Sequence, residues 1–167
     1  MRRVRLIVIL LFFSALPAGG ALGEDVYYHA NLSGRKVVPP VKTPATGLLM
    51  LTVSAKGVTY QLSADGIMTP TAANINRGKK GESGPPVAGL FGGPTKLGRF
   101  SGILAEGTIT AKTLIGDLQG KTLADLVALL KSGNAYVTIL TATYPSGEIR
   151  GQIEPGLGGQ YISRGGR

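Results

Sequence analysis

Two asparagines, Asn74 and Asn76, stand two residues apart in the segment AANINRG, residues 72–78. In an extended strand, side chains at positions i and i+2 point to the same face, so the two amides can act together. Such a pair can contact a ligand, or it can form hydrogen bonds that only hold the sheet together. The sequence leaves both interpretations open.

A second polar pair lies near the end of the chain, where Glu148 and Arg150 are again two residues apart. Their spacing also places them on one side of a strand. They form either a binding pair or a charge pair that fixes the strand and satisfies backbone groups of neighbouring loops.

The most basic region spans residues 77–102, which is rich in glycine and proline and has no hydrophobic period. This composition predicts a long loop, and a loop of such length is either functional or poorly ordered. Its positive charges form an anion-binding surface or only keep the loop solvated. The candidate binding surface thus comprises Asn74, Asn76, Arg77, Lys79, Lys80, Lys96, Arg99, Glu148 and Arg150.

Residue types that perform catalysis are scarce. The chain contains no cysteine and a single histidine, His29, and a lone histidine in a strand is typical of a surface or packing position. No Gly-x-Ser-x-Gly motif, calcium loop or paired-carboxylate motif is present. We therefore expect no catalytic residue, no cofactor and no metal, although the sequence does not settle whether His29 binds a metal.

The first 23 residues have the order of a secretory signal peptide: three arginines, an apolar run over residues 6–16, and a small-residue segment. About eleven apolar residues are too few for a membrane span, which needs about 20. Cleavage after Gly23, with Ala21 three positions before the cut, would start the mature chain at Glu24. The expected location is the periplasm or the extracellular space.

The formal charge of +9 includes the three arginines of this leader, so the mature chain carries 9 − 3 = +6. Export makes nucleic acid an unsuitable target for this charge. The partners that fit are a protein, an anionic polymer or lipid of the cell envelope.

The mature chain reads as many short strands separated by glycine turns. The strand candidates are residues 26–32, 46–54, 58–64, 72–76, 103–111, 135–141 and 148–153, the last as an edge or returning strand. One helix is predicted between Thr122, which can form a capping box with Asp125, and Gly133. These elements favour a mainly β fold, a β-sandwich with one short helix, over residues 24–154. Residues 155–167 are predicted to form a basic, glycine-rich, flexible tail.

Three ordered segments resemble the chordin-type, or CHRD, domain. They are ANLSGRKVVPPVKTPATG at residues 30–47, AANINRGKKGESGPPVAGL at residues 72–90, and LVALLKSGNAYVTILTATYPSGEIRGQI at residues 126–153. The resemblance implies an extracellular or periplasmic β-sandwich of immunoglobulin-like, Greek-key character, with the outline of copper-zinc superoxide dismutase. Its members are described as domains of uncertain molecular role, so it implies fold more than function.

The chain departs from the pattern that it resembles at three histidine positions, which here hold Asn74, Asn76 and Leu140. Imidazole nitrogen suits copper and zinc, whereas amide oxygen binds them poorly and leucine does not bind them at all. We therefore expect an exported, non-enzymatic binding or structural module. The alternative is a copper- or zinc-binding protein of dismutase type with a degenerate site.

Overall fold

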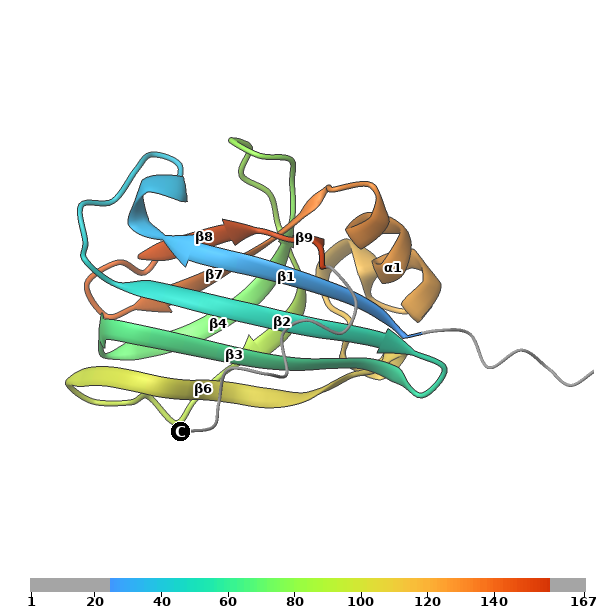
Figure 1. Cartoon of the computed structure of the whole chain (residues 1–167), viewed down its shortest axis with the longest axis horizontal. Coiled ribbons are helices and arrows are strands. Elements are labelled where there is room, and N and C mark those ends of the chain that lie inside the picture. The colour runs from blue at the N-terminus through green and yellow to red at the C-terminus, as the bar shows by residue number, and fades with distance from the viewer. Residues whose placement is uncertain (1–24, 157–167) are drawn as a thin grey trace, which may run out of the picture.

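The computed structural model describes residues 25–156. The expected signal peptide and residues 157–167 of the expected tail lie outside this range. Within it the chain forms nine strands, three short 3-10 helices and one α-helix (Figure 1). No helix in this part of the chain is long and apolar enough to cross a membrane.

The first half of the fold is an antiparallel meander. Strands β1 (Val26–Ser33), β2 (Thr46–Ser54) and β3 (Gly57–Met68) pair in sequence, and β6 (Arg99–Ile109) continues this layer by pairing with β3. Between β1 and β2 the chain forms the 3-10 helix η1 (Gly34–Lys36) and then an irregular loop that contains Pro39, Pro40 and Pro44. Proline cannot donate a ladder hydrogen bond, which is why pairing stops there.

The second half completes the same sheet. Strands β4 (Pro70–Arg77), β5 (Pro86–Phe91), β7 (Ala135–Thr141) and β8 (Ile149–Gln152) follow in the order β5-β4-β7-β8, and β8 adjoins β1. The short β9 (Glu154–Pro155) pairs with β1 as well. The sheet order is therefore β5-β4-β7-β8-β1-β2-β3-β6, and β8 is an interior strand rather than an edge.

This sheet bends until its two ends approach each other, so it is nearly closed into a barrel-like shape (Figure 1). The hydroxyl of Tyr60, on β3, donates a 2.7 Å hydrogen bond to the carbonyl oxygen of Leu90, and so links the end strand β5 to β3, the strand next to the other end strand, β6. The enclosed space is filled by fully buried aliphatic side chains from both halves, such as Leu49, Leu62, Ile75 and Ile139. The expected mainly β fold with one short helix is confirmed.

The helix α1 (Leu123–Lys131) lies at one end of the sheet (Figure 1). Its capping box forms as predicted, because the backbone N–H of Thr122 donates to the Asp125 carboxylate at 2.9 Å. Leu126 and Leu130 are fully buried. Gly133 ends the helical region with a φ of +67°, a conformation that glycine adopts without steric cost. Two further 3-10 helices, η2 (Ala111–Thr113) and η3 (Gly116–Leu118), precede α1.

The prediction of a long loop over residues 77–102 is wrong. The segment PVAGLF forms β5 against β4, with Ile75 opposite Ala88, and β6 already begins at Arg99. A short apolar run between glycines and prolines is typical of a fully buried strand, and Val87 and Ala88 are indeed fully buried. The one long basic loop is therefore two shorter loops, residues 78–85 and 92–98.

The ladder also extends slightly past residue 154. Pro155, the first residue of the expected tail, pairs opposite Tyr28, and the backbone N–H of Gly156 donates to the carbonyl oxygen of Tyr27 at 2.8 Å.

Candidate functional site

The polar face of the sheet runs across β4, β7 and β8. In the first row across these strands, Asn74 lies opposite Thr138, which lies opposite Arg150. Two residues along each strand, Asn76 lies opposite Tyr136, which lies opposite Gln152. Directly paired residues in a sheet share a face. The structure therefore brings Asn74, Asn76 and Arg150 together on one face, as the spacing predicted for Asn74 and Asn76.

Asn76 performs a structural task on this face. It is 8% exposed, and its Nδ2 donates to the carbonyl oxygen of Gly84 at 3.0 Å. Its neighbour Tyr136 holds the same glycine, since the phenol donates to the Gly84 carbonyl oxygen and accepts from the Gly84 N–H, both at 3.1 Å. These bonds fix the loop of residues 78–85 over the sheet, which supports the structural interpretation of Asn76.

Arg150 is the buried cation of this face, with 4% of its surface exposed. Its Cζ lies 3.5 Å from the centroid of the Tyr136 ring, and its Nη2 donates to the Lys79 carbonyl oxygen at 3.1 Å. Burial lowers the pKa of Arg150, yet an arginine side chain remains protonated in proteins. Stacking and one hydrogen bond thus hold a positive charge in a fixed orientation.

Glu148 is equally buried but belongs to a different contact. Its two carboxylate oxygens accept hydrogen bonds from the hydroxyls of Thr43, at 2.7 Å, and Thr141, at 2.9 Å. Among residues 25–156 the one ion pair joins Arg77 and Asp117 at 2.6 Å. Glu148 and Arg150 therefore do not form a charge pair; each fixes a different loop.

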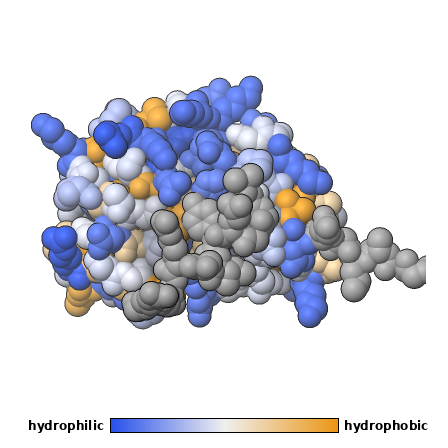
Figure 2. Space-filling view, viewed as in Figure 1, coloured by the Kyte–Doolittle hydropathy of each residue, from blue (hydrophilic) through white to orange (hydrophobic). Residues whose placement is uncertain are grey.

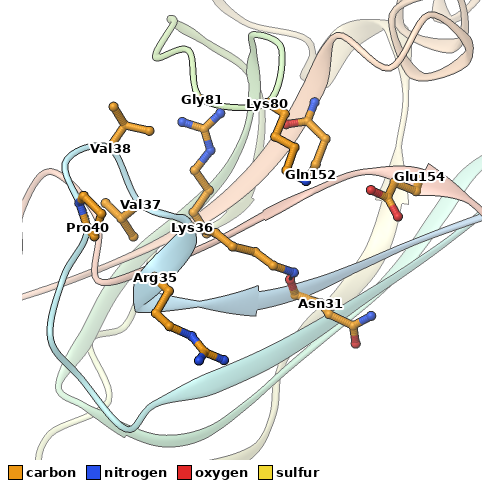
Figure 3. A pocket seen from close by; sticks show the side chains of 11 residues that line it. Asn31, Arg35, Lys36, Val37, Val38, Pro40, Lys80, Gly81, Gln152 and Glu154 are labelled. Carbon is orange, nitrogen blue, oxygen red and sulfur yellow. Dashed lines mark hydrogen bonds between the residues drawn. The ribbon is translucent and has the colours of Figure 1, made fainter.

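A cleft of about 370 Å³ opens beside Arg150 (Figure 3). It lies between η1 with the loop that follows it and the loop of residues 78–85. Its lining residues are Asn31, Arg35, Lys36, Val37, Val38, Pro40, Lys80, Gly81, Arg150, Gln152 and Glu154. Four of these carry positive charge and one carries negative charge, so the cleft favours an anion.

The two walls of the cleft differ in character. In Figure 3, Val37, Val38 and Pro40 lie on one side, while Lys80 and Gln152 lie across from them. Figure 2 shows hydrophilic side chains gathered along the rim where η1 and the loop of residues 78–85 lie. An occupant would meet cations together with a small apolar wall.

Gln152 makes the second wall rigid. Its Nε2 contacts the carbonyl oxygens of Gly78, Gly133 and Ala135 at 2.8 to 3.0 Å. Together with the Gly84 bonds of Tyr136, these contacts hold both ends of the loop that carries Lys80. The cleft is thus formed before any ligand arrives, which reduces the entropy cost of binding.

Of the expected basic residues, Lys80 and Arg150 line the cleft, and Lys79 contributes only its carbonyl oxygen to Arg150. Lys96 lies in the other loop, where its N–H donates to the Pro70 carbonyl oxygen at 3.3 Å. Arg99 begins β6 opposite Met68. Lys96 and Arg99 are therefore not part of the cleft, and neither is Arg77, which pairs with Asp117.

Sequence reasoning missed Asn31, Arg35, Lys36 and Glu154. The motif GRK directly after the first strand carries the signal of two adjacent cations. Only the sheet order, which places β1 next to β8, shows that they approach Arg150.

The three positions at which the resembled pattern has histidine do share one face, since Leu140 lies opposite Ala72, two residues before Asn74. Their side chains offer amides and an alkyl group, which are poor donors for copper or zinc. Within the described part of the chain, no group of three His, Cys, Asp or Glu side chains could hold a metal ion.

Comparison with known proteins gives one informative result. No curated protein and no solved structure matches the chain. The CHRD domain matches residues 28–153, which run from β1 to the residue before β9 and so include every strand of the sheet except that last short one. The chain therefore belongs to the CHRD domain family.

Proposed function

We propose that this CHRD domain is an exported, non-enzymatic binding module that takes an anionic ligand in the basic cleft beside β8. The observation that carries the proposal is the convergence of Arg35, Lys36, Lys80 and Arg150 on one cleft with Glu154 as its acidic residue. The four cations come from three segments that are far apart in the sequence.

Charge and shape both support this role. A concave site lined by one sign of charge raises the local concentration of the opposite charge and accelerates encounter. A cleft volume of 370 Å³ also falls within the usual range of ligand sites.

A binding role fits the lining better than catalysis does. The lining residues provide Glu154 as their carboxylate and include no histidine, serine or threonine. A general acid–base pair or an activated nucleophile needs at least two such groups within hydrogen-bond reach. Arginine and lysine bind and orient an anion through their positive charge and their N–H donors.

The proposal is tested by salt elution of the Glu24-start protein from immobilised heparin, used as a general polyanion. We expect the triple variant Arg35→Gln, Lys36→Gln, Lys80→Gln to elute at clearly lower salt than the parent, because fewer counterions are released on binding. The matched control is Lys56→Gln, Lys96→Gln, Arg99→Gln, which removes the same charge outside the cleft.

If both triple variants elute at the same salt concentration, net charge alone governs binding and the cleft has no special role. That result would overturn the proposal. Thermal unfolding of each variant shows whether the fold is intact, and the substituted side chains are all exposed, so we expect little change.

A further inference from the structure

We infer that the cleft recognises a compact organic anion in a defined orientation, with a carboxylate or phosphate head on Arg150 and an apolar body against Val37, Val38 and Pro40. This inference rests on the proposed function and names the ligand class of the same site.

The guanidinium of Arg150 is placed to hold the head group of the ligand. Its Cζ lies 3.5 Å from the centroid of the Tyr136 ring, so one face of the guanidinium lies against the ring. The N–H groups along the edge of the guanidinium are left for acceptors that lie in its plane. The hydrogen bond to the Lys79 carbonyl oxygen uses one of its five N–H donors. Arg150 lines the cleft, so a planar carboxylate or a phosphate can accept from this edge in the bidentate geometry that arginine favours.

The charge of Arg150 is buried more deeply than the other positive charges of the cleft. Arg150 is 4% exposed, whereas Arg35, Lys36 and Lys80 are exposed on the rim. Exposed charges attract an anion from a distance but are screened by salt, while a partly desolvated charge interacts more strongly. One head group at Arg150, rather than a row of surface charges, is therefore the specific contact.

The apolar wall of the cleft favours an organic ligand over an inorganic ion. Val38 is 43% exposed although it is a large aliphatic residue, and with Val37 and Pro40 it lies across the cleft from Lys80 and Gln152 (Figure 3). A bare inorganic ion would leave this wall exposed to water. An organic body attached to the head group would cover it and gain from burying apolar surface.

The test is a titration of the Glu24-start protein followed by NMR, using the side-chain Nε–Hε signal of Arg150 as the probe. Hexanoate tests a carboxylate head and hexyl phosphate a phosphate head; hexanol is the neutral control and acetate lacks the apolar body. We expect hexanoate or hexyl phosphate to shift the Arg150 signal, hexanol to leave it unchanged, and acetate to bind about tenfold more weakly than hexanoate.

Two variants assign the two halves of the ligand. Val38→Ser should remove most of the advantage of hexanoate over acetate without changing acetate affinity. Arg150→Lys should weaken both acids, and its unfolding temperature reports whether the fold survives. Because the wild-type titration needs no substitution, the inference remains testable even if Arg150→Lys fails to fold.

The outcomes separate the two proposals. If heparin binding depends on the cleft cations but none of the organic anions shifts the Arg150 signal, the binding module stands and the ligand class is wrong. If hexanoate and acetate bind equally, the apolar wall has no role and the inference fails. If elution from heparin does not depend on the cleft cations and no small anion shifts the Arg150 signal, both proposals fail.

Discussion

Glu148 and Arg150 are two residues apart, yet each side chain fixes a different loop. Glu148 accepts hydrogen bonds from Thr43, in the loop before β2, and Arg150 donates to the carbonyl oxygen of Lys79, in the loop after β4. A buried charge is tolerated when hydrogen bonds or a stacked ring satisfy it. Glu148, directly before β8, and Arg150, on β8, therefore fix the two loops between which the cleft lies.

The carboxylate of Glu148 is held by hydroxyls that cannot easily reorient. Thr43 Oγ1 accepts from the N–H of Ala45, and Thr141 Oγ1 accepts from the N–H of Tyr144, while each donates its proton to Glu148. In a Glu148→Gln variant one of these hydroxyls would face an amide NH₂ and lose its acceptor. We expect the free energy of unfolding to fall by about 1–3 kcal/mol, measured by urea denaturation.

The matched control for Glu148→Gln is Glu106→Gln, because Glu106 is exposed on β6. This control should change the free energy of unfolding by less than about 0.5 kcal/mol. Equal stability of the Glu148→Gln variant and the parent would show that the two hydroxyls adapt to the amide.

Single residues could be assigned from the sequence only where a local pattern places them. The spacing of Asn74 and Asn76 gave their common face correctly, because side-chain alternation is a property of any strand. The hydrogen bond from Asn76 to Gly84 depends on how the loop of residues 78–85 folds over the sheet. The stacking of Arg150 on Tyr136 depends on the pairing of β7 with β8. No local pattern contains that information.

At the scale of elements, local chemistry is most decisive in α1. The N–H of Thr122 and its hydroxyl both donate to the Asp125 carboxylate, at 2.9 and 2.8 Å. These bonds lower the pKa of Asp125, the backbone hydrogen bond being the larger cause. A negative charge in the first turn also interacts favourably with the helix dipole.

This cap makes a pH-dependent contribution to stability whose sign follows from the pKa. Since the pKa is lower in the folded state, Asp125 stabilises the fold above the unfolded pKa, about 3.9, and the contribution disappears as the pH falls through the folded pKa. We expect Asp125→Asn to have a lower unfolding temperature than the parent at pH 6. The difference should shrink as the pH falls below about 4.

Thermal unfolding from pH 2.5 to 6 measures this effect, with Asp25→Asn, exposed before β1, as the control. A difference between Asp125→Asn and the parent that stays constant with pH would show that the cap acts through geometry rather than charge.

The elements predicted well are those with a strong local period or a clear cap: β2 has the expected bounds of residues 46–54, and α1 begins after the expected cap. β5 was missed because its apolar residues do not alternate with polar ones, and its glycine and proline suggested a loop. Its hydrogen bonds to β4 are a tertiary feature, which overrides the local composition.

At the scale of the whole molecule, the sequence predicted the fold class but not the site. The strand order places β1 between β8 and β2, so segments more than one hundred residues apart become neighbours. The cleft depends on this contact, because Lys36 and Arg150 approach each other only through it. Four of the six basic residues singled out from the sequence consequently do not line the cleft, whereas Arg35 and Lys36, which were not singled out, do.

Export is the property of the whole chain that remains to be measured. β1 begins at Val26, and β1 is paired along both of its edges, with β2 on one side and with β8 and β9 on the other. Cleavage after Gly23 would leave in place every paired residue of the described range, residues 25–156. With no cysteine, the domain is also held by its core alone and needs no oxidising compartment to fold. We therefore expect export with its signal peptide to yield a mature protein that starts at Glu24, as found by N-terminal sequencing and intact mass.

Ala21→Phe, which places a large side chain three positions before the cut, should block or shift this cleavage, whereas the exposed substitution Lys56→Gln should not. A secreted form that retains Met1 would contradict cleavage after Gly23. A chain recovered only inside the cell would contradict export and would remove envelope polymers and lipids from the set of partners.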